Sequence, residues 1–178
     1  ETDLSGYWHG VSPFEIESGL PKVNHPEKVS WSHLYSDLIN ETMAKDKKMV
    51  LINPATIRGS NLDEIFKNYP SRTFDVGIAE EHALTMASGL SLSGYYPVVS
   101  IYSTFLQRAF DQVSHDLARQ KLKSLLLIDR AGLVGADGDT HQGLYDQAFL
   151  MNTPNTIVSM ASDIHEAAGL FMEAQNHD

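Results

Sequence analysis

The sequence contains no cysteine. That absence excludes a disulfide framework, a thiolate zinc site and a cysteine nucleophile, and it fits a reducing compartment, so we predict a cytoplasmic protein. Basic residues are also scarce, since 13 Lys and Arg stand against 23 Asp and Glu and the formal net charge is −10 at pH 7. Nucleic acids and anionic membranes both attract basic surfaces, so we expect neither as a partner.

Long hydrophobic runs are missing too. No apolar run approaches the roughly 20 residues that a membrane-spanning helix needs, and the acidic, polar start of the sequence is not a signal peptide. The 178 residues, 42% of them hydrophobic, suffice for one globular domain with a packed core. The sequence begins at Glu1 rather than at methionine, and a helical pattern is still running close to Asp178. We therefore expect a piece of a longer protein.

The pattern along the chain divides it into two parts. Residues 1–29 are rich in glycine and proline with interleaved aromatic residues, which predicts an extended inter-domain linker arm. From residue 30 onward, strand and helix patterns alternate, and such an order predicts an α/β domain with an open, mostly parallel sheet and helices on both faces. Strands are expected at 49–53, 73–76, 97–102, 124–129 and 156–160, and helices at 34–43, 62–69, 79–93, 104–122, 144–151 and from 163.

Ligands of such sheets bind beyond the carboxyl ends of the strands, and two strand ends carry notable side chains. Glu80 and Glu81 follow the strand at 73–76. Acids are favoured at any helix N-terminus by the helix dipole, so the alternatives are a capping role and a carboxylate offered to a ligand nitrogen. At the end of strand 97–102 stand Tyr102, Phe105 and Arg108, of which Phe105 fits a core position as well as a ligand stack.

The loop at 130–143 is the richest segment chemically. Its glycines permit close approach of a ligand, Arg130 can clamp a phosphate or carboxylate, and His141 is a candidate for proton transfer. A long polar loop in a small domain usually has a function; the alternative is a surface loop with satisfied turns. Asp137 and Asp139 resemble the start of a calcium loop, but the remaining ligands of that motif are absent. We therefore predict no metal site.

Taken together, these junctions resemble the 1-deoxy-D-xylulose-5-phosphate synthase family of transketolase-like thiamine diphosphate enzymes. The resemblance rests on segments 79–82, 101–112 and 129–143 and covers nearly the whole chain. The first segment alone indicates only the wider transketolase-like group, and Glu81 stands where this family is expected to have glutamine. The resemblance implies a pyrimidine-binding domain at residues 30–178. It also implies that the domain binding the diphosphate and Mg²⁺, and a C-terminal domain, lie outside this chain.

The resemblance further implies a reaction. Pyruvate and glyceraldehyde 3-phosphate are condensed to 1-deoxy-D-xylulose 5-phosphate and CO₂, the first step of the non-mevalonate isoprenoid pathway, by a homodimer that uses thiamine diphosphate. The fragment alone is expected to be inactive. Glu80 corresponds to the catalytic glutamate that bonds to the pyrimidine ring of the cofactor, and Phe105 to the aromatic residue that stacks on it. Positions implied to bind the cofactor or substrates, with His141 also catalytic, are Tyr102, Arg108, Arg130, Asp137 and His141.

Other functions remain open from the sequence. A transketolase-type ketol transferase, or one subunit of a split thiamine diphosphate enzyme, would also need Glu80. A non-catalytic binding or scaffolding domain is the alternative from a different class. Release of CO₂ from pyruvate separates the synthase from a ketol transferase, and the dependence of activity on Glu80 separates both from a scaffold.

Overall fold

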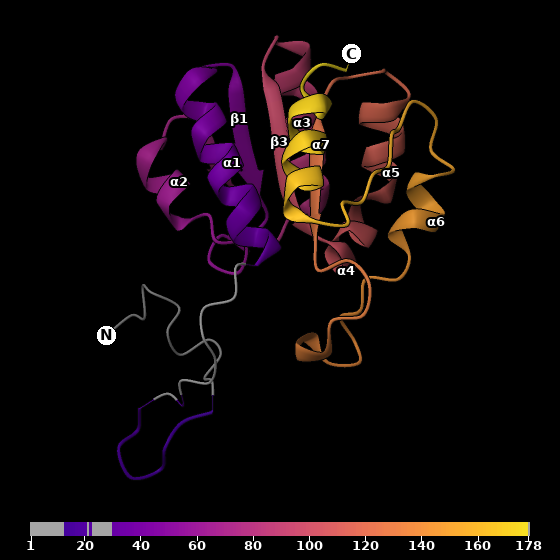
Figure 1. The fold of residues 1–178 in the computed structure, drawn as a ribbon. Coiled ribbons are helices and arrows are strands. Elements are labelled where there is room, and N and C mark those ends of the chain that lie inside the picture. Colours follow the sequence, from indigo (N-terminus) through magenta and orange to yellow (C-terminus); the bar gives the residue numbers. More distant parts are fainter. Residues whose placement is uncertain (1–12, 21, 23–29, 178) are drawn as a thin grey trace.

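The computed structural model describes residues 13–20, 22 and 30–177. Most of the predicted linker arm, 1–29, therefore lies outside the described residues. The domain after it holds a parallel sheet in the order β2-β1-β3-β4 (Figure 1). The strands are β1 (Met49–Asn53), β2 (Thr73–Asp75), β3 (Tyr96–Tyr102) and β4 (Leu125–Asp129). The α-helices are α1 (Trp31–Lys45), α2 (Asp63–Asn68), α3 (Glu80–Leu92), α4 (Ser103–Leu106), α5 (Phe110–Gln112), α6 (Asp146–Leu150) and α7 (Ile164–Ala174).

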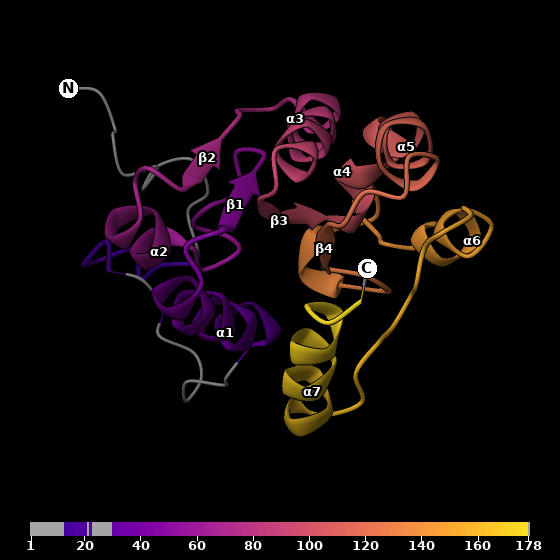
Figure 2. The same cartoon turned by 90° about the horizontal axis from the view of Figure 1, so that it is seen from above.

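Helices cover both faces of the sheet, as the sequence predicted (Figure 2). Successive side chains of a strand point to opposite faces, and strand β1 shows the result: Leu51 packs in one buried cluster and Ile52 in the other. The first cluster is completed by residues of α1, α2 and α7, and the second by residues of α3, α4 and α6. Two packed layers therefore hold the sheet rigidly and fix the positions of its strand ends.

The start of α1 is tied to the end of β4. Ser30 is the N-cap residue, and its hydroxyl accepts a hydrogen bond from the backbone N–H of His33. Ser32 is the other serine near this helix start, and it donates a hydrogen bond of 2.7 Å to Oδ2 of Asp129. Because Asp129 ends β4, this bond anchors the beginning of the loop at 130–143.

Two expected elements differ in the structure. Thr156–Met160 is not a strand, and its Ile157 and Met160 side chains are 74% and 75% exposed. An apolar pattern by itself does not supply the hydrogen-bonded pairing that makes a strand. In the described residues β4 forms the edge of the sheet, and this segment does not pair with it. The helix expected at 104–122 is helical but irregular. The backbone turns out of α-geometry at Ala109, and a 3₁₀ turn at Gln107–Ala109 and a π-helix at Val113–Ala118 flank α5.

Candidate functional site

The candidate residues gather at the carboxyl edge of the sheet. Glu80 opens α3, Tyr102 ends β3, and the loop at 130–143 follows β4 and extends beyond the sheet (Figure 1). Two adjoining pockets lie at this edge and share Thr104, Phe105 and His141. The first has a volume of about 230 Å³ and is lined by Tyr102, Thr104, Phe105, Arg130, Asp137 and His141. The second is also lined by Arg108, the partner of Glu80.

Glu80 is a buried acid, and one of its two carboxylate oxygens has no hydrogen-bond partner among the described residues. Its side chain is only 2% exposed, and its Oε1 accepts a 2.7 Å hydrogen bond from Nη1 of Arg108. Its Oε2 is buried with no hydrogen-bond partner among the described residues. A buried polar atom without a partner carries a desolvation cost. The arrangement therefore favours a ligand that donates a hydrogen bond to this oxygen.

Phe105 lies at the centre of an aromatic and cationic cluster. Its ring stacks on Tyr102, with the centroids 5.7 Å apart and the planes inclined by 16°. His141 meets Phe105 edge-on at 5.6 Å, and the guanidinium carbon of Arg108 lies 5.1 Å from the centroid of the Phe105 ring. These contacts hold the ring in one orientation where the two pockets meet.

Arg130 is positioned by an unusual backbone and by its neighbours. Its φ of +57° lies in the left-handed region, which residues other than glycine rarely adopt, and turns the chain directly after β4. The guanidinium carbon lies 4.2 Å from the centroid of the Tyr102 ring, and Nη1 donates a 2.5 Å hydrogen bond to Oδ1 of Asp137. A guanidinium carries five N–H donors, and the side chain is 37% exposed. The group therefore retains capacity to bind an anion in the first pocket.

The hydroxyl of Tyr102 stays protonated over a wide pH range. Burial raises the pKa of Tyr102 above its ordinary value, and the positive charge of Arg130 partly opposes that rise. A neutral phenol can donate a hydrogen bond. The first pocket therefore combines a cation with a neutral donor.

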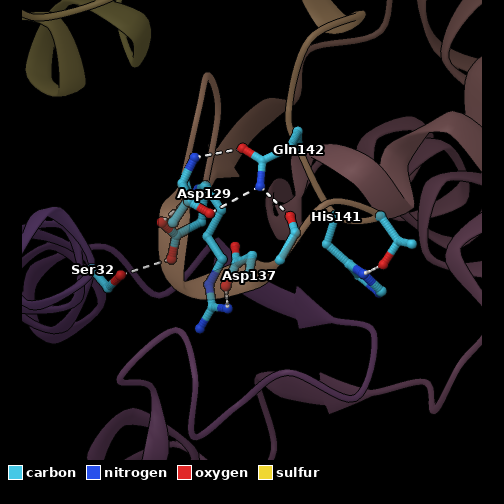
Figure 3. A network of polar contacts seen from close by, with 9 residues as sticks. Ser32, Asp129, Asp137, His141 and Gln142 are labelled. Carbon is cyan, nitrogen blue, oxygen red and sulfur yellow. Dashed lines mark hydrogen bonds and ion pairs between the residues drawn. The ribbon is translucent and has the colours of Figure 1, made fainter.

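The loop at 130–143 is held together internally (Figure 3). Gly132 and Gly143 form an antiparallel bridge, with N–H to O distances of 2.7 and 2.9 Å measured between the nitrogen and oxygen atoms. Inside it, the Gln142 amide accepts from the N–H of Val134 and donates to the carbonyl oxygens of Val134 and Gly138. Hydrogen bonds thus close the loop at its two ends and brace its interior, and they fix the positions of Asp137 and His141.

His141 is exposed at the rim of both pockets. Its Nδ1 lies 2.6 Å from Oγ1 of Thr140, and this contact orients the ring (Figure 3). An exposed imidazole beside a pocket can exchange protons with a bound substrate. The proton-transfer role predicted for His141 from the sequence stays a prediction, as do the individual roles of the other candidate residues.

Sequence reasoning missed a second layer of residues behind the pockets. Ser103 donates a short hydrogen bond to Oδ2 of Asp146, and both side chains are buried. The other carboxylate oxygen of Asp146 is buried with no partner among the described residues. Gly59, in the segment between β1 and α2, lies against Tyr102 and Arg130. No local pattern marks these residues, because their partners lie far away in the sequence.

Two features are absent from the described part of the chain. In the part of the chain that the structure describes, no group of three or more His, Asp or Glu side chains is arranged to hold a metal ion. Within the same residues, no helix has the length and apolar character needed to cross a membrane.

Comparison with known proteins places these observations in context. The family described as transketolase, pyrimidine binding domain, matches residues 27–178. Among curated proteins, the 1-deoxy-D-xylulose-5-phosphate synthase of Bacillus velezensis is 49% identical over 181 aligned residues, and that of Listeria welshimeri is 48% identical over 178. Both alignments cover all of this chain but only 28% of the relative.

Among solved structures, one described as a split gene transketolase, an inactive β4 tetramer, has a TM-score of 0.71 and 26% sequence identity. The superposition covers 82% of this chain and 47% of the other. The chain therefore spans a little over a quarter of the curated relatives and about half of this structural neighbour.

Proposed function

Because the chain belongs to the transketolase pyrimidine-binding domain family, we propose that it is the pyrimidine-binding part of a 1-deoxy-D-xylulose-5-phosphate synthase. The whole enzyme would condense pyruvate with glyceraldehyde 3-phosphate and release CO₂. The identity of 48–49% to curated synthases along the entire chain supports this reaction over ketol transfer.

The unpartnered Oε2 of Glu80 is the observation that carries the proposal. It fits the protonated ring nitrogen of an aminopyrimidine, which is a hydrogen-bond donor and needs a carboxylate partner. Arg108 contacts both Glu80 and the Phe105 ring, so the two residues lie in one neighbourhood. Phe105 is the aromatic residue on which we propose that the pyrimidine ring stacks. When bound, thiamine diphosphate supplies a nucleophilic carbon for pyruvate and an electron sink for the loss of CO₂.

The side chains of this chain have separate tasks in that reaction. Arg108 orients the Glu80 carboxylate through the hydrogen bond to its Oε1, so that Oε2 faces the pyrimidine nitrogen and accepts the hydrogen bond from it. Arg130, oriented by Asp137, binds the phosphate of glyceraldehyde 3-phosphate. His141 stands at the pocket rim, where it can donate a hydrogen bond or proton to the oxygen of the aldehyde as charge develops there.

We place the remaining parts of the machinery outside this chain. Mg²⁺ would be bound with the diphosphate by a separate domain, since the described residues offer no cluster of metal ligands. A further C-terminal domain and assembly as a homodimer belong to the same proposal. The absence of cysteine supports a reducing compartment, for which we propose the cytoplasm.

The test uses the full-length protein that contains this chain, supplied with thiamine diphosphate and Mg²⁺. CO₂ release from pyruvate is measured with and without glyceraldehyde 3-phosphate, and the sugar product is identified. We expect a deoxyketose phosphate. Glu80→Gln should lower the rate by roughly 10²-fold or more, because the amide cannot act as the carboxylate does. Glu81→Gln is the matched control: its side chain is the neighbouring, exposed acid, and its loss should leave the rate unchanged.

Other outcomes point to other functions. Ketol transfer without CO₂ release would identify a transketolase-type enzyme. Equal activity of the Glu80→Gln and Glu81→Gln variants would contradict any role of Glu80 in catalysis and favour a scaffold. Activity that appears only after a second chain is added would indicate a split enzyme, the arrangement named for the structural neighbour.

A further inference from the structure

Gly59 lies where no side chain fits. A Cβ atom built on it would overlap the hydroxyl oxygen of Tyr102, lie 3.2 Å from Cζ of the same ring, and lie 3.6 Å from Nη2 of Arg130. The φ angle of Gly59 is outside the left-handed region that favours glycine. Its backbone would therefore accept alanine, and the constraint is one of space alone.

The Tyr102 ring has little freedom to move away. Tyr102 is 8% exposed and is the last residue of the buried strand β3. Phe105 stacks on it at 5.7 Å, and the Arg130 guanidinium carbon lies 4.2 Å from its centroid. Displacing the phenol would therefore disturb Arg130, and with it the ion pair to Asp137.

We propose that Gly59 is a positioning residue of the first pocket: the space left by its missing side chain holds the Tyr102 hydroxyl and thereby fixes Arg130. The ligand affected is the anion that Arg130 binds, which under the proposed function is the phosphate of the aldehyde substrate. Gly59 acts through Tyr102, because the Tyr102 hydroxyl is the atom that a Cβ at position 59 would overlap, whereas the 3.6 Å distance to Arg130 is an ordinary contact. Its influence should therefore fall on the phosphorylated aldehyde and spare pyruvate.

The test is a double-mutant cycle in the full-length protein with Gly59→Ala, Tyr102→Phe and both together. We expect Gly59→Ala to raise KM for glyceraldehyde 3-phosphate by on the order of tenfold, as contacting residues commonly couple at this level, with little change in KM for pyruvate. Tyr102→Phe removes the overlapping oxygen. The double variant should therefore lose far less relative to Tyr102→Phe than Gly59→Ala loses relative to the wild type, because only the 3.2 Å contact with Cζ of the ring remains. Gly89→Ala is the control, since a Cβ at that exposed helical position meets no atom within 4 Å.

Three results would overturn the proposal: an unchanged KM in Gly59→Ala, equal losses for both substrates, or a double variant whose losses simply add. For the same four proteins, the affinity for inorganic phosphate is measured by calorimetry. Their free energies of unfolding are measured as well. If the wild type makes no deoxyketose phosphate, the proposed function fails, yet a coupled loss of phosphate binding still supports the role of Gly59. If Gly59→Ala alone does not fold, recovery of folding in the double variant supports it, and failure of both overturns it.

Discussion

Tyr96 shows how burial of one hydroxyl makes the stability of the fold depend on pH. It begins β3, and its hydroxyl donates a 3.2 Å hydrogen bond to the carbonyl oxygen of Ala174 at the end of α7. Burial raises the pKa of Tyr96 from 10.0 to about 12. Between these pH values the unfolded chain loses a proton that the folded chain keeps. The free energy of unfolding must therefore fall as pH rises from about 10 to about 12.

We expect Tyr96→Phe to remove this part of the pH dependence. Denaturant unfolding of wild type and variant, measured at several pH values from 8 upward, should give curves that converge as the wild type loses stability above pH 10. The matched control is Tyr95→Phe, because Tyr95 is the adjacent tyrosine and its side chain is 44% exposed. A constant difference between wild type and Tyr96→Phe at every pH would contradict the prediction.

At the scale of single residues, the sequence predicts what is local and misses what is not. Glu80, Tyr102 and Arg130 stand beside strand ends, and parallel strands bring their carboxyl ends to one edge. Their gathering was therefore predictable, and the structure confirms that they share this edge. Gly59 was not predictable, because its importance depends on where the Tyr102 side chain lies. The unpaired oxygen of Glu80 likewise emerges only from packing.

At the scale of elements, the loop at 130–143 depends on how closely its last residue approaches α4 and the start of the loop itself. A Cβ on Gly143 would overlap Oγ of Ser103 and lie 2.6 Å from the carbonyl oxygen of Arg130 and 2.8 Å from Cα of Ala131. Two of these three neighbours are backbone atoms, which cannot turn aside as a flexible side chain can. The loop and the Ser103–Asp146 hydrogen bond behind it therefore exist in this form only with glycine at 143.

We expect Gly143→Ala to destabilise the fold by about 1–3 kcal/mol, the usual cost of overpacking, and to lower kcat/KM because Arg130, Asp137 and His141 shift together. Urea unfolding and steady-state kinetics of the full-length protein measure the two effects. Gly135→Ala is the control within the same loop, as its Cβ would meet no atom within 4 Å and its φ is not positive. Equal behaviour of the two variants would refute the close-packing argument.

The alternation of strands and helices was predictable because each element carries its own periodicity, and β1 to β4 are all found where that pattern placed them. The strand at 156–160 was predicted wrongly, since Ile157 and Met160 satisfy the apolar pattern without a partner strand beside them. The irregular helix after α4 could not be foreseen either. Its apolar stripe is preserved through the break at Ala109, so the hydrophobic pattern does not reveal the change of helix type.

At the scale of the whole molecule, the candidate site has an apolar and uncovered rim. Ile78, just before Glu80, and Leu133, in the loop at 130–143, are each 80% exposed, and Leu144 and Tyr145 are 54% and 59% exposed. Exposed apolar side chains grouped at a site are typical of surfaces that another protein part covers. This fits the comparison with the curated synthases, which are more than three times as long as the aligned segment. The family itself was predicted from the motifs of the sequence, and the comparisons confirm it.

The last prediction concerns the chain taken alone. We expect residues 1–178, purified by themselves and given pyruvate, thiamine diphosphate and Mg²⁺, to release no CO₂ above background. Under the proposed function, Glu80 and Phe105 bind only the pyrimidine end of the cofactor, and the described residues provide no cluster of ligands for the metal that would bind its diphosphate. The full-length protein, assayed beside it at equal molar concentration, should be active. Turnover by the chain alone at a comparable rate would mean that the whole cofactor site is built from these 178 residues, and the proposed division of the site between domains would then be wrong.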